Sequence, residues 1–152
     1  MTDARRFMRA LAVLLLLVTL LTFTAQPAVA GGRSERFRAE MLRLVNRTRS
    51  SNGRDTLRLN DHLSREAWRH SVEMGRRYVL FHTTNMWDLV QPYDARVWGE
   101  NVAYASTLRR VEELWMHSYE HRVNLLNPSF RWAAIGVVKA NGWLWVTLQM
   151  YG

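Results

Sequence analysis

The stretch IGVVKANGWLWVTLQMY, residues 135–151, carries the strongest secondary-structure signal in the chain. Two runs rich in β-branched and aromatic residues, 135–140 and 143–151, flank the dipeptide Asn141-Gly142. Both of these residues tolerate positive φ, which the type I′ turn of a two-residue hairpin requires. In the second run tryptophans alternate with aliphatic residues, so both faces are apolar and at least one packs beneath helices. The stretch therefore predicts an antiparallel β-hairpin covered by helices.

Three segments upstream of the hairpin have the apolar period of amphipathic helices. The first begins at Ser34, a residue type that caps helix N-termini, and is broken by Ser50-Ser51-Asn52-Gly53. The second follows Asn60-Asp61 and ends near Gly75. The third follows Ser106 as its cap and ends near Ser118. Each segment is expected to bury one face.

The connecting segments complete the predicted order of elements. Short extended pieces are expected at 56–59 and 99–105, and a loop is expected at 81–97, which contains Pro92 and shows no period. A turn-rich passage is expected between Ser118 and Pro128. Helices combined with an antiparallel hairpin indicate a layered α+β fold. Because no repeat or linker interrupts residues 31–152, they are expected to form one domain.

Residues 1–30 have the pattern of a cleaved signal peptide. A basic start with Arg5, Arg6 and Arg9 precedes a mostly apolar run at 10–23, and Ala28-Val29-Ala30 supplies small residues for cleavage. The run is shorter than the roughly 18–20 apolar residues that span a bilayer. We therefore expect a secreted or extracytoplasmic protein, cleaved near Ala30, with no stable membrane anchor.

The remaining chain has the size of one domain and contains no cysteine. Removal of residues 1–30 from the 152-residue chain leaves 122 residues, enough to form a core without disulfides. Small secreted domains of eukaryotes usually carry disulfides, so their absence favours a bacterial protein. The absence of cysteine also excludes thiol catalysis and thiolate metal sites.

The charge of the chain is positive but dispersed. Without residues 1–30, which hold three of the 21 basic and one of the 13 acidic side chains, the formal net charge is +6. Such a charge suits nucleic acid, anionic lipid or an acidic wall polymer. The arginines are scattered, however, and no basic run of the kind that marks a binding patch occurs. We therefore favour a solvated surface and expect no nucleic-acid partner.

Three ionisable residues in distant parts of the sequence are the candidates for chemistry. His82 lies where the second helix gives way to a loop, Glu100 lies in the Gly99-Glu100-Asn101 segment, and His121 follows the third helix. Two histidines and a carboxylate can bind zinc or transfer a proton. No short ligand spacing joins them, and a structural His–Glu hydrogen bond has the same sequence pattern. Spacing alone favours the structural role.

Other polar and aromatic residues give weaker indications. His70 lies on an apolar helix face, where a hydrogen-bonded core histidine is the usual role, and no nucleophile-elbow motif surrounds a serine. Most of the seven tryptophans are expected in the core. Trp87 and Trp98, which lie near loops, are the best candidates for ligand contact.

The order of several motifs resembles a known family. The motifs are Leu63-Ser64-Arg65-Glu66-Ala67, His82-Thr83, Gly99-Glu100-Asn101-Val102-Ala103, Trp115-Met116-x-Ser118, His121-Arg122-x-Asn124-Leu125-Leu126, Ile135-Gly136-Val137 and Trp145-Val146-Thr147-Leu148-Gln149. This order is similar to that of the CAP superfamily, which comprises the cysteine-rich secretory proteins, antigen 5 and the pathogenesis-related 1 proteins. The closer likeness is to its cysteine-free bacterial branch, and it extends from Phe37 to Tyr151.

The resemblance implies both a fold and a site. The fold is a three-layer α–β–α sandwich with a central antiparallel sheet. The site is a cleft lined by two histidines and two glutamates, which in some relatives holds a divalent ion such as zinc. His82 and His121 match the histidines and Glu100 the first glutamate, while Ser118 stands where the second glutamate is expected. The implied cleft therefore contains His82, Glu100, Asn101, Ser118 and His121, with His82 and His121 as metal ligands in an incomplete set.

Three functions are compatible with this resemblance, because a shared fold does not fix an activity. The first is a non-catalytic exported module that binds a lipid, a peptide or a cell-wall ligand in the cleft. The second is a metal-dependent hydrolase in which His82, Glu100 and His121 activate a water molecule. The third is a scaffold in which these residues only tie the sheet to the helices. We favour the binding module.

Overall fold

The computed structural model describes residues 27–152, with side chains from Gly32 onward. Residues Ser34–Gly152 form one compact unit, separate from the unit that ends at Arg33, and the description below concerns the former. The predicted signal peptide lies outside the described residues, apart from the helical backbone of residues 27–30, and it stays a prediction. No helix in the described part of the chain is long and apolar enough to cross a membrane.

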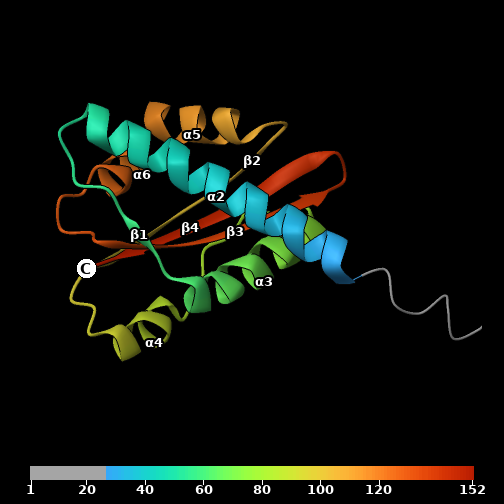
Figure 1. Cartoon of the computed structure of the whole chain (residues 1–152), viewed down its shortest axis with the longest axis horizontal. Coiled ribbons are helices and arrows are strands. Elements are labelled where there is room, and N and C mark those ends of the chain that lie inside the picture. Colours follow the sequence, from blue (N-terminus) through green and yellow to red (C-terminus); the bar gives the residue numbers. More distant parts are fainter. Residues whose placement is uncertain (1–26) are drawn as a thin grey trace, which may run out of the picture. The chain divides into compact units, whose positions relative to one another are not determined.

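The described part of the chain consists of helices and the strands of one four-stranded sheet (Figure 1). In spatial order the strands are β1, β3, β4 and β2, so β2 lies at one edge. In chain order the elements are α2 (Pro27–Ser51), β1 (Arg58–Leu59), α3 (Asp61–Arg77), α4 (Met86–Val90), the 3₁₀ helix η1 (Gln91–Tyr93), β2 (Trp98–Ala105), α5 (Leu108–His117), α6 (Tyr119–Leu125), β3 (Trp132–Ala140) and β4 (Trp143–Tyr151).

The predicted hairpin is confirmed and forms the centre of the sheet. β3 and β4 pair antiparallel from Ala140 opposite Trp143 to Trp132 opposite Tyr151. Asn141 and Gly142 have φ of 54° and 82°, the positive values that a type I′ turn requires. β2 adds to β4 antiparallel, whereas the two-residue β1 joins β3 in parallel. The sheet is therefore mixed, with its three long strands antiparallel.

Helices cover both faces of the sheet, which confirms the α–β–α layers (Figure 1). On one face, α2, α5 and α6 bury apolar side chains such as Met41, Val111 and Leu125 against the strands. On the other face, α3 and α4 pack through residues such as Leu63. Gly136 permits a close approach there, because a Cβ atom at this position would lie 2.1 Å from the backbone of Ala67.

The boundaries of several elements differ from the sequence predictions. α2 begins at Pro27 instead of Ser34, and proline suits the first turn of a helix because it has no N–H to satisfy. The cap of α5 is Thr107, not Ser106, since the Thr107 hydroxyl accepts a hydrogen bond from the Arg110 N–H.

Two segments predicted as loops or turns contain short helices. Residues 81–97 include α4 and η1, and the passage after Ser118 is largely α6. α4 buries only Met86 and Val90, and α6 only Leu125. Helices this short repeat their apolar face too few times to give a detectable period.

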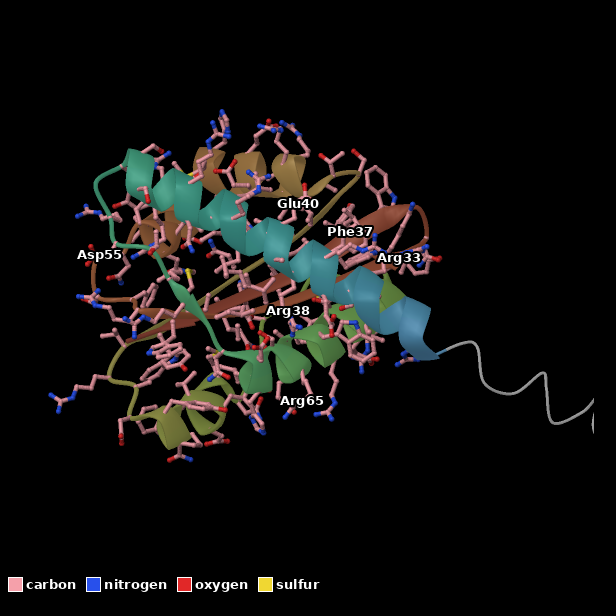
Figure 2. All side chains as sticks on the ribbon, in the orientation of Figure 1. Arg33, Phe37, Arg38, Glu40, Asp55 and Arg65 are labelled. Atoms are coloured by element: carbon pink, nitrogen blue, oxygen red, sulfur yellow. The ribbon has the colours of Figure 1, made fainter. Side chains whose placement is uncertain are left out.

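A polar hollow lies between α2 and the start of α3. Arg38 of α2 lies 3.6 Å from the carboxylate of Asp61 at the start of α3. Arg38 and Arg65, labelled in Figure 2, line the hollow, which has a volume of about 600 Å³. Its lining carries charges of both signs, and none of the predicted site residues belongs to it.

Candidate functional site

The edge strand β2 presents two polar side chains to opposite faces of the sheet. Successive residues of a strand point to opposite faces, so Glu100 and Asn101 are directed to different layers. Glu100 lies opposite Gln149 of β4 and bonds to it on the face covered by α3. Asn101 is fully buried and bonds to α6. The Gly-Glu-Asn segment therefore links the sheet to both helical layers.

The Glu100 carboxylate is buried and its hydrogen-bonding capacity is filled. Its side chain is only 6 % exposed. Oε1 accepts from the Thr83 backbone N–H and from His82 Nδ1, both at 2.9 Å. Oε2 accepts from the Thr83 hydroxyl at 2.5 Å and from Gln149 Nε2 at 3.0 Å. Burial acts to raise the pKa of Glu100, but the bonds from Thr83, Gln149 and His82 outweigh it and leave the pKa below its usual value.

His82 is held by this carboxylate yet is largely exposed, at 61 % of its side chain. An ionised carboxylate only accepts hydrogen bonds, so His82 Nδ1 carries the proton that it donates to Glu100. In the neutral ring the other nitrogen, Nε2, is then an acceptor. Nε2 has no hydrogen bond within the described part of the chain, so it is available to a ligand from solvent.

On the opposite face, asparagine side chains hold α6 across the edge of β2. Asn101 Nδ2 donates to the backbone carbonyl of His121 at 2.9 Å, and Asn124 Nδ2 donates to Asn101 Oδ1 at 3.2 Å. Gly99 leaves room for this contact, because a Cβ there would lie 3.0 Å from Asn124 Oδ1. These bonds fix the start of α6, and with it the position of His121.

His121 lies near His82 and is partly buried. Burial lowers the pKa of His121, and the charge of His82 lowers it further, while Glu120 acts in the opposite direction. The effect of His82 shows that two residues 39 positions apart in the sequence come close together in space. The lowered pKa keeps His121 neutral at pH 7, so its ring can accept as well as donate a hydrogen bond.

The residues present do not fit a divalent metal ion. No three histidine, aspartate or glutamate side chains within residues 27–152 are arranged to hold an ion together. His82 Nδ1 and both Glu100 oxygens are already engaged in hydrogen bonds. Ser118 starts α6 and makes no side-chain bond to the Glu100 cluster among the described residues. The predicted ligand pair His82 and His121 therefore lacks the further ligands that zinc requires.

The structure thus brings together some of the predicted site residues and adds others. His82 and Glu100 are bonded directly, and Asn101 is bonded to the backbone of His121. Sequence reasoning did not assign Thr83 and Gln149, which supply three of the four bonds to the carboxylate. Gln149 could have been found from its strand, because it is a polar residue in the mostly apolar β4 and shares a face with Thr147.

Two exposed tryptophans lie next to this cluster. Trp98 precedes Glu100 by two residues on β2 and therefore shares its face. Its ring lies 5.0 Å from the ring of Trp87 on α4, with an interplanar angle of 42°. The two residues are 44 % and 47 % exposed. Both rings are accessible, and their contact with a ligand stays a prediction. The expectation that most tryptophans lie in the core is wrong, because only Trp115 and Trp145 of the described tryptophans are buried.

Comparisons with known proteins agree with this architecture. The family described as the cysteine-rich secretory protein family, CAP, matches residues 42–151. The uncharacterized protein YkwD of Bacillus subtilis is 28 % identical over 123 residues, which cover 76 % of this chain and 47 % of YkwD. This chain thus spans about half the length of that relative.

Solved structures show the same fold. An extracellular protein of Bacillus anthracis with an SCP domain has a TM-score of 0.69 at 22 % identity, covering 86 % of this chain and 45 % of that one. An outer surface protein of Borrelia burgdorferi has a TM-score of 0.65 at 18 % identity, covering 74 % and 90 % of the two chains. With the family match extending over most of the described unit, the chain belongs to the CAP, or cysteine-rich secretory protein, family.

Proposed function

We propose that this protein is an exported, non-catalytic binding module that recognises a saccharide of the cell wall. The observation that supports it most is the state of His82, an exposed imidazole fixed by a buried and fully bonded carboxylate. A residue that served only the core would be expected to be buried with its partner. Here the carboxylate is buried and the imidazole is directed to solvent.

The arrangement favours binding over hydrolysis. A general base must have a lone pair available for the proton it removes. Glu100 directs both oxygens to donors from the protein, so it orients His82 and has no free position for a water molecule. His82 Nε2 keeps a lone pair, but the metal-dependent hydrolase also needs about three protein ligands around its ion, and no three such side chains gather in the described part of the chain.

The chemistry around His82 suits a sugar. Saccharides have apolar C–H faces that stack on aromatic rings and hydroxyl groups that both donate and accept hydrogen bonds. The Trp87–Trp98 pair offers exposed aromatic surface beside Glu100. The free Nε2 of His82 and the neutral ring of His121 offer hydrogen bonds of both kinds. A linear wall glycan could contact the tryptophans and the histidines together.

A peptide that pairs with β2 as an added strand is a less suitable ligand than a sugar, because side chains of the protein already bond to carbonyls of β2. Trp115 Nε1 donates to the carbonyl of Val102 at 3.3 Å, and Asn124 Nδ2 donates to the carbonyl of Glu100 at 3.4 Å. A peptide that extends a sheet needs such carbonyls free. A lipid chain would need a deep apolar cavity, whereas the groups around Glu100 are hydrogen-bonding side chains.

An exported location is part of the proposal. It is supported by the predicted signal peptide and by similar structures that are described as extracellular or outer-surface proteins. In that location the abundant saccharide is the wall polymer.

The proposal is tested by titrating the purified protein with soluble peptidoglycan fragments and following the tryptophan fluorescence. Trp87→Ala and Trp98→Ala should each weaken binding at least tenfold, and His82→Ala should also weaken it. Trp68→Ala is the matched control, because Trp68 is 41 % exposed on α3 and has no ring contact to this pair. Equal affinity of all four variants and the parent protein, or binding only to lipid vesicles or peptides, would contradict the proposal.

A further inference from the structure

Behind Glu100, a second polar cluster occupies the layer between α3 and the sheet. His70 Nδ1 lies 3.1 Å from the Thr147 hydroxyl, which lies 2.8 Å from the Ser71 hydroxyl. The Ser71 hydroxyl also bonds to the carbonyl of Gly136 at 3.1 Å. None of these groups takes part in the proposed ligand contacts. Their hydrogen-bond directions can nevertheless be assigned.

The direction of each bond follows from counting protons. A carbonyl can only accept, so Ser71 must use its one hydroxyl proton on Gly136. The Thr147 hydroxyl proton must then be donated to Ser71. Thr147 can therefore only accept from His70, which places the proton of a neutral His70 ring on Nδ1. His70 Nε2 is left as an acceptor.

The direction of the Gln149 amide is fixed in the same way. Its Nε2 group donates one proton to Glu100 Oε2 and the other to the Thr83 hydroxyl oxygen. Turning the amide over would direct Gln149 Oε1 against the carboxylate, which repels it. Gln149 Oε1 is therefore also an acceptor, and the residue is fully buried.

These two acceptors are the buried side-chain atoms that have no hydrogen-bond partner within the described residues: His70 Nε2 and Gln149 Oε1. They belong to the same region. Thr147 and Gln149 are two residues apart on one face of β4, about 7 Å from each other. The pKa of His70 also responds to the charges of Glu100 and His82, so the ring lies within range of the Glu100 cluster.

We infer that His70 Nε2 and Gln149 Oε1 form a buried site for one small neutral hydrogen-bond donor, a water molecule, located behind Glu100. Neither acceptor can satisfy the other, because both lack a proton. A water molecule donates two hydrogen bonds and is retained in protein interiors by two to four polar partners. A cation is a poorer occupant, since both acceptors are uncharged and no three charged or imidazole ligands gather in the described part of the chain.

The bound water makes His70 a positioning residue. It connects α3 to Gln149, which in turn holds Glu100 and so His82. Burial and the charge of His82 lower the pKa of His70, with Glu100 acting against them, and a neutral ring is the form that this site requires. The site exists whatever the exposed histidine binds, so it stands apart from the proposed function.

The first test is the tautomer of His70, measured by long-range ¹H–¹⁵N correlation on the labelled protein at pH 7. We expect the proton on Nδ1 and a bare Nε2. A proton on Nε2 would allow a direct bond to Gln149 and would overturn the inference. This measurement needs no substitution and is therefore independent of whether a variant folds.

The second test detects the water itself. We expect cross-relaxation between a long-lived water and the Gln149 side-chain amide, and an ordered water about 2.7–3.2 Å from both acceptors in a high-resolution crystal structure. In His70→Asn the amide can still donate to Thr147 but does not reach the Nε2 position, so the water signal should be lost. His62→Asn, at an exposed position of the same helix, should keep it. A signal that persists in His70→Asn, or a peak with the height and coordination of an ion, would contradict the inference.

Discussion

Arg49 and Glu100 both place an ionisable group inside the protein, but their surroundings differ. Arg49 is 0 % exposed and donates only to backbone carbonyls, those of Asp55, Leu125, Asn127 and Phe130. Glu100 is almost as buried, yet one of its four hydrogen bonds comes from the exposed imidazole of His82. The arginine is enclosed on all sides, whereas the carboxylate is connected to the surface.

This difference separates a structural charge from a site. Arg49 joins the C-terminal end of α2 to the end of α6 and the segment before β3, and nothing outside the protein can reach it. Burial lowers the pKa of Arg49, as does the charge of Arg131. Glu100 accepts a hydrogen bond from Nδ1 of His82 and leaves Nε2 of the same ring without a bond to any described residue. Burial of a charge alone therefore does not identify a functional residue; the exposed partner of the buried Glu100 is the reason why we propose His82 as a site residue.

The largest effect on stability is expected from replacing Arg49, the structural charge of this comparison. Arg49→Met should lower the free energy of unfolding by about 3–5 kcal/mol, because several buried carbonyls lose their donor together. Chemical denaturation measures the change. Arg47→Met on the exposed side of the same helix should change it by less than about 0.5 kcal/mol. A loss at position 49 as small as the control would mean that the buried arginine is not a structural tie.

Glu100→Gln should have the next largest effect, a loss of about 1–3 kcal/mol at pH 7, because an amide directs N–H groups at Thr83 and Gln149. The pKa of Glu100 is lowered in the folded protein, so its stabilising contribution is present above the unfolded pKa and is lost as the pH falls through the folded value. The difference between parent and variant should therefore shrink as the pH falls below the unfolded pKa of about 4.3 and vanish only below the lowered folded pKa. Glu120→Gln, at an exposed position, should show no such pH-dependent difference.

A smaller pH effect is expected from the buried histidines. The pKa values of His70 and His121 are lowered by burial, so the unfolded chain binds protons more readily than the folded one. Their contribution to stability is complete above about pH 6.5 and declines as the pH falls. His121→Phe should flatten this decline relative to the parent protein, while His117→Phe, at an exposed position, should leave it unchanged. An equal slope in all three proteins would contradict the pKa assignments.

Much of the fold could be predicted because its signals are local. The Asn141-Gly142 turn and the helical periods depend on neighbouring residues alone, and the structure confirms them. Arg49 could not be predicted, since it is one of several arginines in its helix and only tertiary packing buries it. Its role depends on carbonyls more than 70 residues away.

The site was predictable only in part. The motif order indicated His82, Glu100, Asn101 and His121, and the structure brings these residues together. Thr83 and Gln149 were missed as ligands of the carboxylate, because a buried hydrogen-bond network depends on strand register and not on spacing. From the sequence, a metal site could not be decided, because Ser118 stands where the second glutamate is expected. The described residues provide no complete set of metal ligands.

The most direct test of the account measures stability and wall-fragment binding together in His82→Ala. If His82 is a site residue held by Glu100, the free energy of unfolding should change by no more than about 0.5 kcal/mol, as for other exposed side chains, while binding is weakened at least tenfold. A loss of about 1–3 kcal/mol in stability with unchanged binding would show that His82 is instead a structural tie between the loop and the sheet.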